Sequence, residues 1–136
     1  MPMQLDIVTP EREVFSDQVD STVLPGIEGE LGILPNHAPL VTILKPGELT
    51  YTKGGETEHL AVGEGFVEVT QTKVAVMTDL AMGEAEIDED AVEKALQRAR
   101  DALDEKSTAE EVAAVQASIQ KALAQLHVKR RRRRTL

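Results

Sequence analysis

The hydrophobic positions divide the chain into two parts with different periodicities. Up to about residue 80, short apolar runs alternate with turn residues, and residues 66–70 alternate between apolar and polar, which is typical of a half-buried strand. The strands predicted in this way are 4–8, 14–15, 19–24, 31–34, 48–52, 57–62, 65–70 and 73–78. The glycine pair Gly54-Gly55 predicts a hairpin between two of them. About eight to ten short strands at this spacing indicate an antiparallel sandwich or barrel.

The pattern beyond Gly83 is helical, because neither Pro nor Gly occurs from residue 84 to residue 136. Asp88 or Asp90 can cap a first helix, and Ser107 or Thr108 can cap a second. The apolar positions recur every three or four residues, as on one face of a helix. They are Val92, Leu96, Ala99 and Leu103 in the first helix and Val112, Val115, Ile119, Ala122 and Leu126 in the second. The short connection predicts an antiparallel hairpin with a thin apolar seam, which we expect the sandwich or a partner to support.

Composition narrows the class of protein. Of the 136 residues, 41% are hydrophobic but only 2% are aromatic, so the core must consist of aliphatic side chains. There is no cysteine, which excludes disulfides, thiolate metal sites and a cysteine nucleophile. No apolar run approaches the roughly 18 residues that span a bilayer, and the first residues do not resemble a signal peptide. We therefore expect a soluble protein whose membrane association goes through a partner.

Charge is distributed unevenly along the chain. The formal net charge is −9, yet residues 129–134 are six consecutive basic residues, so the rest of the chain is strongly acidic. An acidic body argues against nucleic acid as its ligand. The basic tail is compatible with a solubilising end or with a contact to an acidic protein surface or anionic lipid. It has no interleaved aromatic residues on which bases could stack.

No catalytic constellation is evident. His37, His59 and His127 are scattered over the chain and have no metal-ligand spacing, so we expect no metal site. The chain lacks the GxSxG nucleophile elbow of serine α/β-hydrolases and any cysteine–histidine pair. The glycine-rich segment 26–32 lacks the lysine of a phosphate-binding loop and carries two glutamates that would repel phosphate.

Several segments resemble the F-type ATP synthase epsilon subunit family. The most specific is 25–40, which reads PGIEGELGILPNHAPL, and 65–69 followed by 74–77 matches the family's second block. The opening residues 6–10 and the segment 124–128 also fit, so the resemblance runs from about residue 3 to residue 128.

This resemblance implies a ten-stranded antiparallel β-sandwich over residues 1–84, an antiparallel two-helix hairpin over 85–128 and a basic tail over 129–136. It implies a non-catalytic rotor subunit of the central stalk, bound to the gamma subunit and to the ring of c subunits. Such a subunit couples ion-driven ring rotation to ATP synthesis. It would be peripheral on the cytoplasmic side of the plasma membrane, held there by the complex and with no nucleic-acid partner.

The resemblance also suggests interface residues. For the gamma subunit and the c-ring these are Glu28, Gly29, Glu30, Leu31 and His37, in a segment whose glycines are also needed for turns. In this family the hairpin can extend along gamma and restrain ATP hydrolysis through transient contacts with the catalytic beta and alpha subunits. Basic candidates for these contacts are Arg98, Arg100, Lys106, Lys121, Arg130 and Arg131. Removal of 129–136 is accordingly expected to raise the ATPase rate of the complex.

Some relatives bind ATP at the start of the first helix through an Ile/Leu-Asp-x-x-Arg-Ala pattern. Here Asp88 matches, but Ala91 and Val92 occupy the arginine and alanine positions. The remaining nucleotide-binding candidates are Arg98 and Lys121. One lost charged contact costs about 1.5–3 kcal/mol, so we expect no cofactor and at most weak ATP binding. The alternatives to a rotor subunit are a stand-alone ATP-sensing module and an independent small hydrolase or isomerase.

Overall fold

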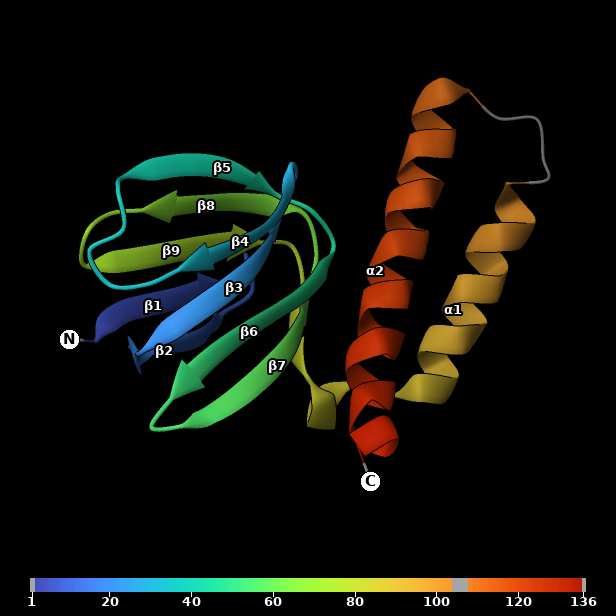
Figure 1. The fold of residues 1–136 in the computed structure, drawn as a ribbon. Coiled ribbons are helices and arrows are strands. Elements are labelled where there is room, and N and C mark those ends of the chain that lie inside the picture. Colours follow the sequence, from blue (N-terminus) through green and yellow to red (C-terminus); the bar gives the residue numbers. More distant parts are fainter. Residues whose placement is uncertain (1, 104–107, 136) are drawn as a thin grey trace.

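A computed structural model describes residues 2–103 and 108–135, and it has the two parts that the periodicity predicts (Figure 1). The strands are β1 (Met3–Val8), β2 (Glu13–Val19), β3 (Ser21–Gly26), β4 (Gly29–Ile33), β5 (Leu40–Leu44), β6 (Gly47–Lys53), β7 (Glu56–Val62), β8 (Gly65–Val69), β9 (Lys73–Thr78) and β10 (Ala81–Gly83). A 3₁₀ turn, η1 (Glu84–Glu86), leads to the helices α1 (Glu89–Ala102) and α2 (Ala109–Thr135).

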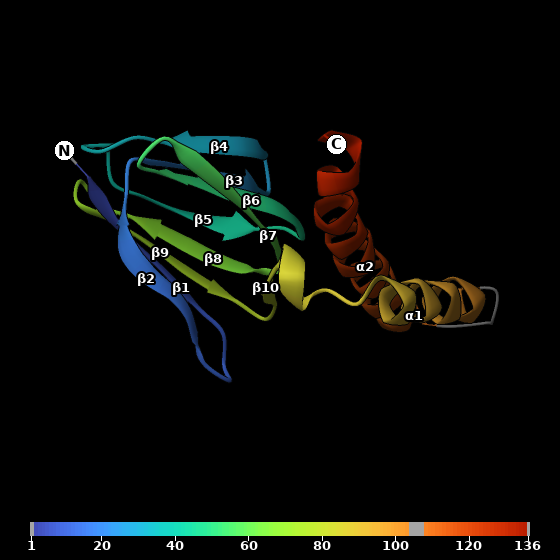
Figure 2. The ribbon, with the colours of Figure 1, turned by 90° about the horizontal axis from the view of Figure 1, so that it is seen from below.

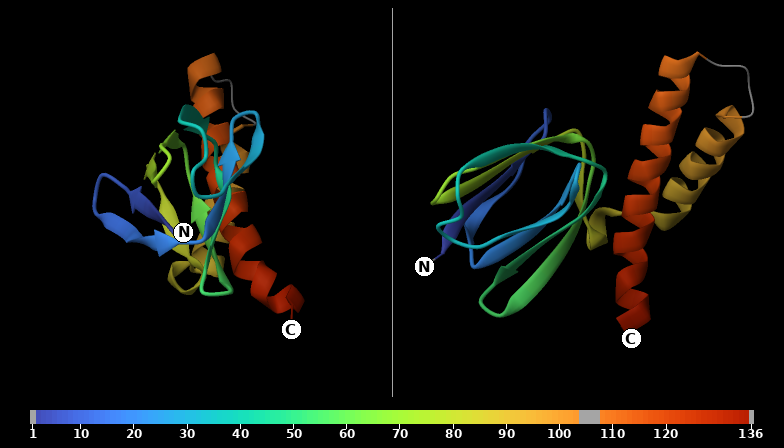
Figure 3. Two further views of the ribbon diagram at one scale, coloured as in Figure 1. Left: turned by 60° about the vertical axis from the view of Figure 1, so that its left-hand side comes forward. Right: turned by 45° about the horizontal axis from the view of Figure 1, so that its top comes forward.

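The strands form a two-layered sandwich. Their pairing order is β10-β7-β6-β3-β5-β8-β9-β1-β2, with β4 paired to β3. This path folds over where β3 passes from β6 to β5, so that one layer contains β10, β7, β6, β3 and β4 and the other contains the remaining strands (Figures 2 and 3). The predicted sandwich followed by a helical hairpin is therefore confirmed.

One strand pair departs from the antiparallel pattern. β1 and β9 run parallel, with Leu5 opposite Val74 and Ile7 opposite Val76. These strands come from distant parts of the sequence, so no hairpin forces them to be antiparallel. The sequence analysis also did not single out β5 and β10. β5 is apolar on both faces and shows no alternation, and β10 has only three residues.

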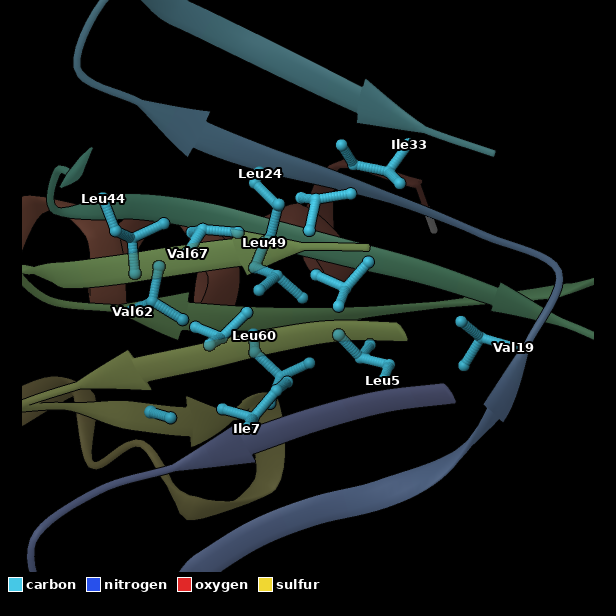
Figure 4. Close-up of a cluster of buried hydrophobic side chains, with 14 of the residues drawn as sticks. Leu5, Ile7, Val19, Leu24, Ile33, Leu44, Leu49, Leu60, Val62 and Val67 are labelled. Carbon is cyan, nitrogen blue, oxygen red and sulfur yellow. The ribbon is translucent and has the colours of Figure 1, made fainter. Parts of the chain in front are cut away.

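The core lies between the two layers and is aliphatic, as the composition predicts. Side chains from both layers point into it (Figure 4), and the largest of them are fully buried. They include Leu5, Ile7, Leu24, Leu44, Leu49 and Val67. At the edge of the sandwich, the ring of Phe15 on β2 lies 4.4 Å from that of Tyr51 on β6, between centroids. This contact joins the two layers of the sandwich where β2 lies next to β6.

The glycine pair forms the predicted hairpin turn between β6 and β7. Gly54 and Gly55 have φ angles of 60° and 84°. Positive φ at both central residues gives the turn a twist that matches the flanking strands, and glycine adopts it without a steric penalty.

The helices begin at caps that the sequence contains. The carboxylate of Asp88 accepts a hydrogen bond from the backbone N–H of Ala91 at 3.2 Å. The hydroxyl of Thr108 accepts one from the N–H of Glu111, also at 3.2 Å. Of the alternative caps, Asp88 is used rather than Asp90, and Ser107 lies outside the described residues.

The hairpin packs against the sandwich, as expected. α2 runs antiparallel to α1 and lies along the outer face of β6 and β7 (Figure 1). A second apolar cluster fills this junction and includes Ala61 of β7, Val92 and Leu96 of α1, and Ala122 and Val128 of α2. α2 also continues to Thr135, so the basic segment extends this helix instead of forming a separate tail. Along the described chain, no helix has the length and apolar character that crossing a bilayer requires.

Asp6 on β1 is expected to contribute to the dependence of stability on pH. Hydrogen bonds from the side chains of Gln4 and then Ser16, with the ammonium of Lys73 nearby, hold the pKa of the Asp6 carboxyl below its usual value. A lowered folded-state pKa contributes stability that is present above the unfolded pKa of about 3.9 and is lost as the pH falls through the folded value.

We therefore expect Asp6→Asn to lose stability at pH 6 while losing less on acidification than the parent. Urea unfolding of both proteins at pH 6 and at about pH 2 measures this difference. Equal acid losses in the two proteins would exclude this role for Asp6.

Candidate functional site

An apolar row crosses the outer face of the layer that contains β5, β8, β9 and β1. We use the term apolar row for Ile43, Phe66, Met77 and Val8. The strand register places Ile43 opposite Phe66, Phe66 opposite Met77, and Met77 opposite Val8. Because neighbouring strands lie about 4.8 Å apart, the four side chains form a continuous line. Each of them has a buried neighbour in its strand that belongs to the core, namely Leu44, Val67, Val76 or Ile7.

The apolar row is unusually exposed for such large side chains. Phe66 is 58% exposed and Ile43 is 51% exposed. Phe66 is one of only two phenylalanines in the chain. Two grooves flank it, one of about 420 Å³ on the Ile43 side and one of about 390 Å³ on the Met77 side. A contiguous apolar ridge with grooves on both sides is typical of a surface that another protein covers.

Two further apolar side chains extend this surface. Val41 lies two residues before Ile43 on the same face of β5 and is 72% exposed. Ile27, in the turn between β3 and β4, is 55% exposed, and its N–H donates to the carbonyl of Ile43 at 2.9 Å. The β3–β4 turn therefore borders the apolar row.

The predicted interface residues are divided between two places. Glu28 is exposed in the β3–β4 turn beside Ile27, and Gly29 and Glu30 are exposed at the start of β4. Leu31, also in β4, is partly buried against the core. His37 lies in the loop after β4. In this loop the N–H of residue 36 donates to the carbonyl of residue 71, in the turn between β8 and β9. His37 is therefore at the opposite end of the sandwich from the β3–β4 turn.

The outer face of the other layer is covered by α2. Glu48, Ala61 and Met82 are aligned across β6, β7 and β10 in the strand register. Ala124 and Val128 of α2 are buried in this junction. The sequence analysis identified only the seam between the two helices and missed this second face. Its signal was the run Ala117, Lys121, Ala124 and Val128, whose spacings of four, three and four continue to Arg131.

The junction also contains a polar group that we call the Glu48 cluster: Glu48 of β6, His59 of β7, and His127 and Arg131 of α2. The guanidinium of Arg131 donates to both carboxylate oxygens of Glu48, from Nε to Oε2 at 2.8 Å and from Nη2 to Oε1 at 2.6 Å. The Glu48 side chain is only 14% exposed. A bidentate pair of this kind is stronger and more directional than a single contact.

Two histidines lie close to this pair. His59 Nδ1 is 3.4 Å from Glu48 Oε1, without the geometry of a hydrogen bond. His127 Nε2 is 3.8 Å from Glu48 Oε2 and 3.2 Å from Arg131 Nη2. The cluster therefore brings together one carboxylate, one guanidinium and two imidazoles from two strands and one helix.

Three more basic side chains of α2 pair with acidic residues. Lys121 contacts Asp79 just before β10, and Lys129 Nζ lies 3.3 Å from Glu84 Oε1 of η1. Arg130 bridges instead to α1, where it donates to Glu89 at 2.6 Å and also contacts Glu93. The hydrogen bond to Glu89, with the charges of Glu89 and Glu93, raises the pKa of the Arg130 guanidinium above its usual value.

The basic residues predicted to contact catalytic subunits thus have different surroundings. Lys121, Arg130 and Arg131 are paired within the chain in this pose. Arg98 and Arg100 are exposed on α1. Lys106 lies outside the described residues.

The nucleotide-binding candidates are only partly brought together. Asp88 and Lys121 line one groove of about 370 Å³ between the two helices, together with Ala91 and Gln125. Arg98 does not line this groove. Asp88 is engaged as the cap of α1 and Lys121 with Asp79. Within residues 2–103 and 108–135, no three His, Asp or Glu side chains are grouped so as to hold a metal ion.

Comparison with known proteins identifies two adjoining domains. Residues 2–84 match the family model described as the beta-sandwich domain of the ATP synthase delta/epsilon chain, and residues 85–130 match the model of its long alpha-helix domain. The ATP synthase epsilon chain of Herpetosiphon aurantiacus is 41% identical over 133 residues, which cover 98% of each chain. That of Dehalococcoides mccartyi is 44% identical over 133 residues, covering 97% of this chain and 95% of that relative.

Solved structures share the fold. One chain in the cryo-EM structure of Euglena gracilis mitochondrial ATP synthase, comprising OSCP, F1 and the c-ring, superposes with a TM-score of 0.77 at 24% identity. The match covers 93% of this chain and 79% of that one. A chain in the central stalk and c-ring of Tetrahymena thermophila mitochondrial ATP synthase gives 0.71 at 15% identity, covering 95% and 97%.

Proposed function

The chain belongs to the ATP synthase delta/epsilon family, and on this premise we propose that it is the non-catalytic rotor subunit that docks its sandwich on the gamma subunit of the central stalk. The observation that carries this proposal is the apolar row around Phe66. A side chain of this size is expected to be covered in the working assembly, because its exposure forgoes the stabilisation of about 1.5–3 kcal/mol that burial provides. A rotating stalk requires such a firm, pre-formed contact.

The remaining contacts follow the same arrangement. The β3–β4 turn, with Glu28 exposed in it and Glu30 exposed at the start of β4, borders the apolar row and is proposed to lie at the gamma and c-ring contact. The loop that carries His37 is proposed as a second contact at the far end of the sandwich. The complex then holds the chain peripherally at the cytoplasmic side of the plasma membrane and transmits ion-driven ring rotation to the catalytic subunits.

The hairpin is proposed to restrain ATP hydrolysis when it leaves the sandwich. In the pose seen here α2 lies flat on β6 and β7. Release would free Lys121 and Arg131 for transient contact with acidic surfaces of the beta and alpha subunits, alongside the already exposed Arg98 and Arg100. Arg130 is paired with α1 and would join them once the two helices also separate. The small side chains of the junction, among them Ala61, Ala122 and Ala124, support such a two-pose element, because each contributes little apolar area.

Binding to gamma tests the docking directly. The purified chain is mixed with the gamma subunit of the same organism, and the mixture is run on a size-exclusion column. We expect the chain and the gamma subunit to elute together as a stable one-to-one complex. We also expect the chain to bind the assembled stalk and c-ring. Separate elution of the two proteins at micromolar concentration would rule out the docking.

For nucleotide we propose at most weak binding at the groove beside Asp88. Isothermal titration of ATP into the full chain is expected to show no micromolar site. Ala91→Arg restores a cation at the mouth of this groove and should strengthen ATP binding about tenfold, the worth of one charged hydrogen bond. Lys94→Arg, on the exposed part of the same helix, is the control and should leave the affinity unchanged. Micromolar affinity in the parent chain would instead favour an ATP-sensing module.

A further inference from the structure

We propose that the Glu48 cluster is a latch that holds the hairpin against the sandwich. The first basic residues of the segment 129–134 then stabilise this packed position of the hairpin, which we call the lowered pose. Arg131, near the C-terminal end of α2, is the residue through which this end of the helix contacts β6. In this proposal the Glu48–Arg131 pair holds the hairpin against the sandwich, and no bound nucleotide is required. The consequence for ATP hydrolysis rests on the function proposed above.

Geometry distinguishes the Glu48–Arg131 pair from the exposed, single-contact ion pairs among the described residues. It joins residues 83 positions apart, has two hydrogen bonds of 2.6 and 2.8 Å, and involves a carboxylate that is 14% exposed. The pair formed by Arg12 and Glu86 has a single contact, and both of its side chains are about half exposed. Exposed single contacts contribute little, whereas bidentate pairs are more directional, and salt screens a partly buried pair less than an exposed one.

The position of the pair makes it a latch. Glu48 lies directly across the strand register from Ala61, which is fully buried beneath α2. Arg131 lies one helical turn beyond Val128, the most deeply buried residue of α2 in this junction. The apolar contacts of Ala124 and Val128 are small, so the charged pair at the end of the helix is expected to decide how often this end lifts. Lys121 with Asp79 and Lys129 with Glu84 support the same attachment from other positions along α2.

The latch gives the basic residues an effect on ATP hydrolysis opposite to the one expected above, as long as the hairpin lies against the sandwich. As contacts to catalytic subunits, they act only after the hairpin is released. As a latch, Arg131 disfavours release. Deletion of 129–136 removes both effects at once and cannot separate them. Glu48→Gln weakens the latch and leaves every basic residue in place.

The absence of cysteine in the chain permits a direct measurement of lifting. Ala61→Cys places a thiol beneath α2, and Val67→Cys places one inside the sandwich core, where both parent side chains are fully buried. Iodoacetamide, a small neutral reagent, labels the first thiol when the hairpin lifts and the second only when the sandwich opens. The ratio of the two labelling rates therefore isolates hairpin lifting in the full chain.

We expect Glu48→Gln and Arg131→Gln each to raise the labelling rate of the Ala61→Cys protein about tenfold, equivalent to about 1.4 kcal/mol, without changing that of the Val67→Cys protein. The double variant should be no faster than either single one, because the two side chains act as one pair. Lys53→Gln is the matched control, since it removes an exposed pair with Asp17 that does not involve the hairpin. An unchanged rate at Ala61→Cys, or an equal rise at both thiols, overturns the latch.

In the assembled complex, Glu48→Gln is expected to lower ATPase activity, since more hairpins are free to restrain hydrolysis. If the thiol experiment succeeds but this activity is unchanged or higher, the latch stands and the proposed restraint by the released hairpin is wrong. If the thiol experiment shows no lifting, the latch is wrong whatever the ATPase rate. The two proposals therefore fail separately.

Discussion

Phe66→Asp is expected to abolish binding of this chain to the gamma subunit. The substitution places a charge at the centre of the apolar row, between Ile43 and Met77. Central aromatic residues of an interface typically contribute at least 2 kcal/mol, so affinity should fall by at least about 30-fold. The size-exclusion experiment described above, repeated over a range of concentrations, measures the loss.

Two controls make this result specific. Phe66→Leu keeps the side chain apolar and should retain most of the binding. Leu123→Asp also puts a charge in place of an exposed hydrophobic residue, but on α2 and away from the apolar row, and should have little effect. Because Phe66 points away from the core, the free energy of unfolding of Phe66→Asp should stay close to that of the parent. Undiminished gamma binding by Phe66→Asp would exclude the apolar row as the docking surface.

Gly65→Ala is expected to destabilise the sandwich by about 3 kcal/mol or more, a large part of the total stability of a domain of this size. Gly65 begins β8 opposite Thr78, and a Cβ there would lie 1.8 Å from the carbonyl oxygen of Met77. That neighbour is backbone and cannot rotate away, so the β8–β9 pairing must separate at this end. Urea unfolding monitored by circular dichroism measures the loss.

Gly32→Ala is the matched control, because a Cβ at that position on β4 meets nothing within 4 Å. Its effect should stay within about 0.5 kcal/mol. If the two variants unfold at the same urea concentration, the close approach of β8 and β9 at Gly65 is not what requires glycine there.

The fold could be predicted from the sequence largely because each part has its own periodicity. The turn at Gly54-Gly55 and the cap at Asp88 are local signals, and the structure uses both. The parallel pairing of β1 with β9 was not predictable in this way, because it joins distant segments and leaves no local trace. The alternation in β5 was hidden because its outward residues, Val41 and Ile43, are as apolar as its inward ones.

The site was less accessible to sequence reasoning. The apolar row depends on the register of four strands, which places Phe66 beside Ile43 and Met77 although they are far apart in the sequence. The Glu48 cluster likewise joins β6, β7 and the end of α2. A lone glutamate in a strand gives no sign of its partner 83 residues away. The basic segment was visible as a run of charge, but its attachment to the sandwich appears only in the fold.

The placement of α2 between α1 and the sandwich imposes an order on how the hairpin can come apart (Figure 1). α1 is attached chiefly through its seam with α2, so α1 can peel away while α2 stays on β6 and β7. The reverse sequence is obstructed, since α2 cannot leave the sheet without carrying α1 or breaking its seam with it. An outside force applied to α1 therefore acts first on the seam between α1 and α2, and it reaches the contact between α2 and the sandwich only after that seam has opened.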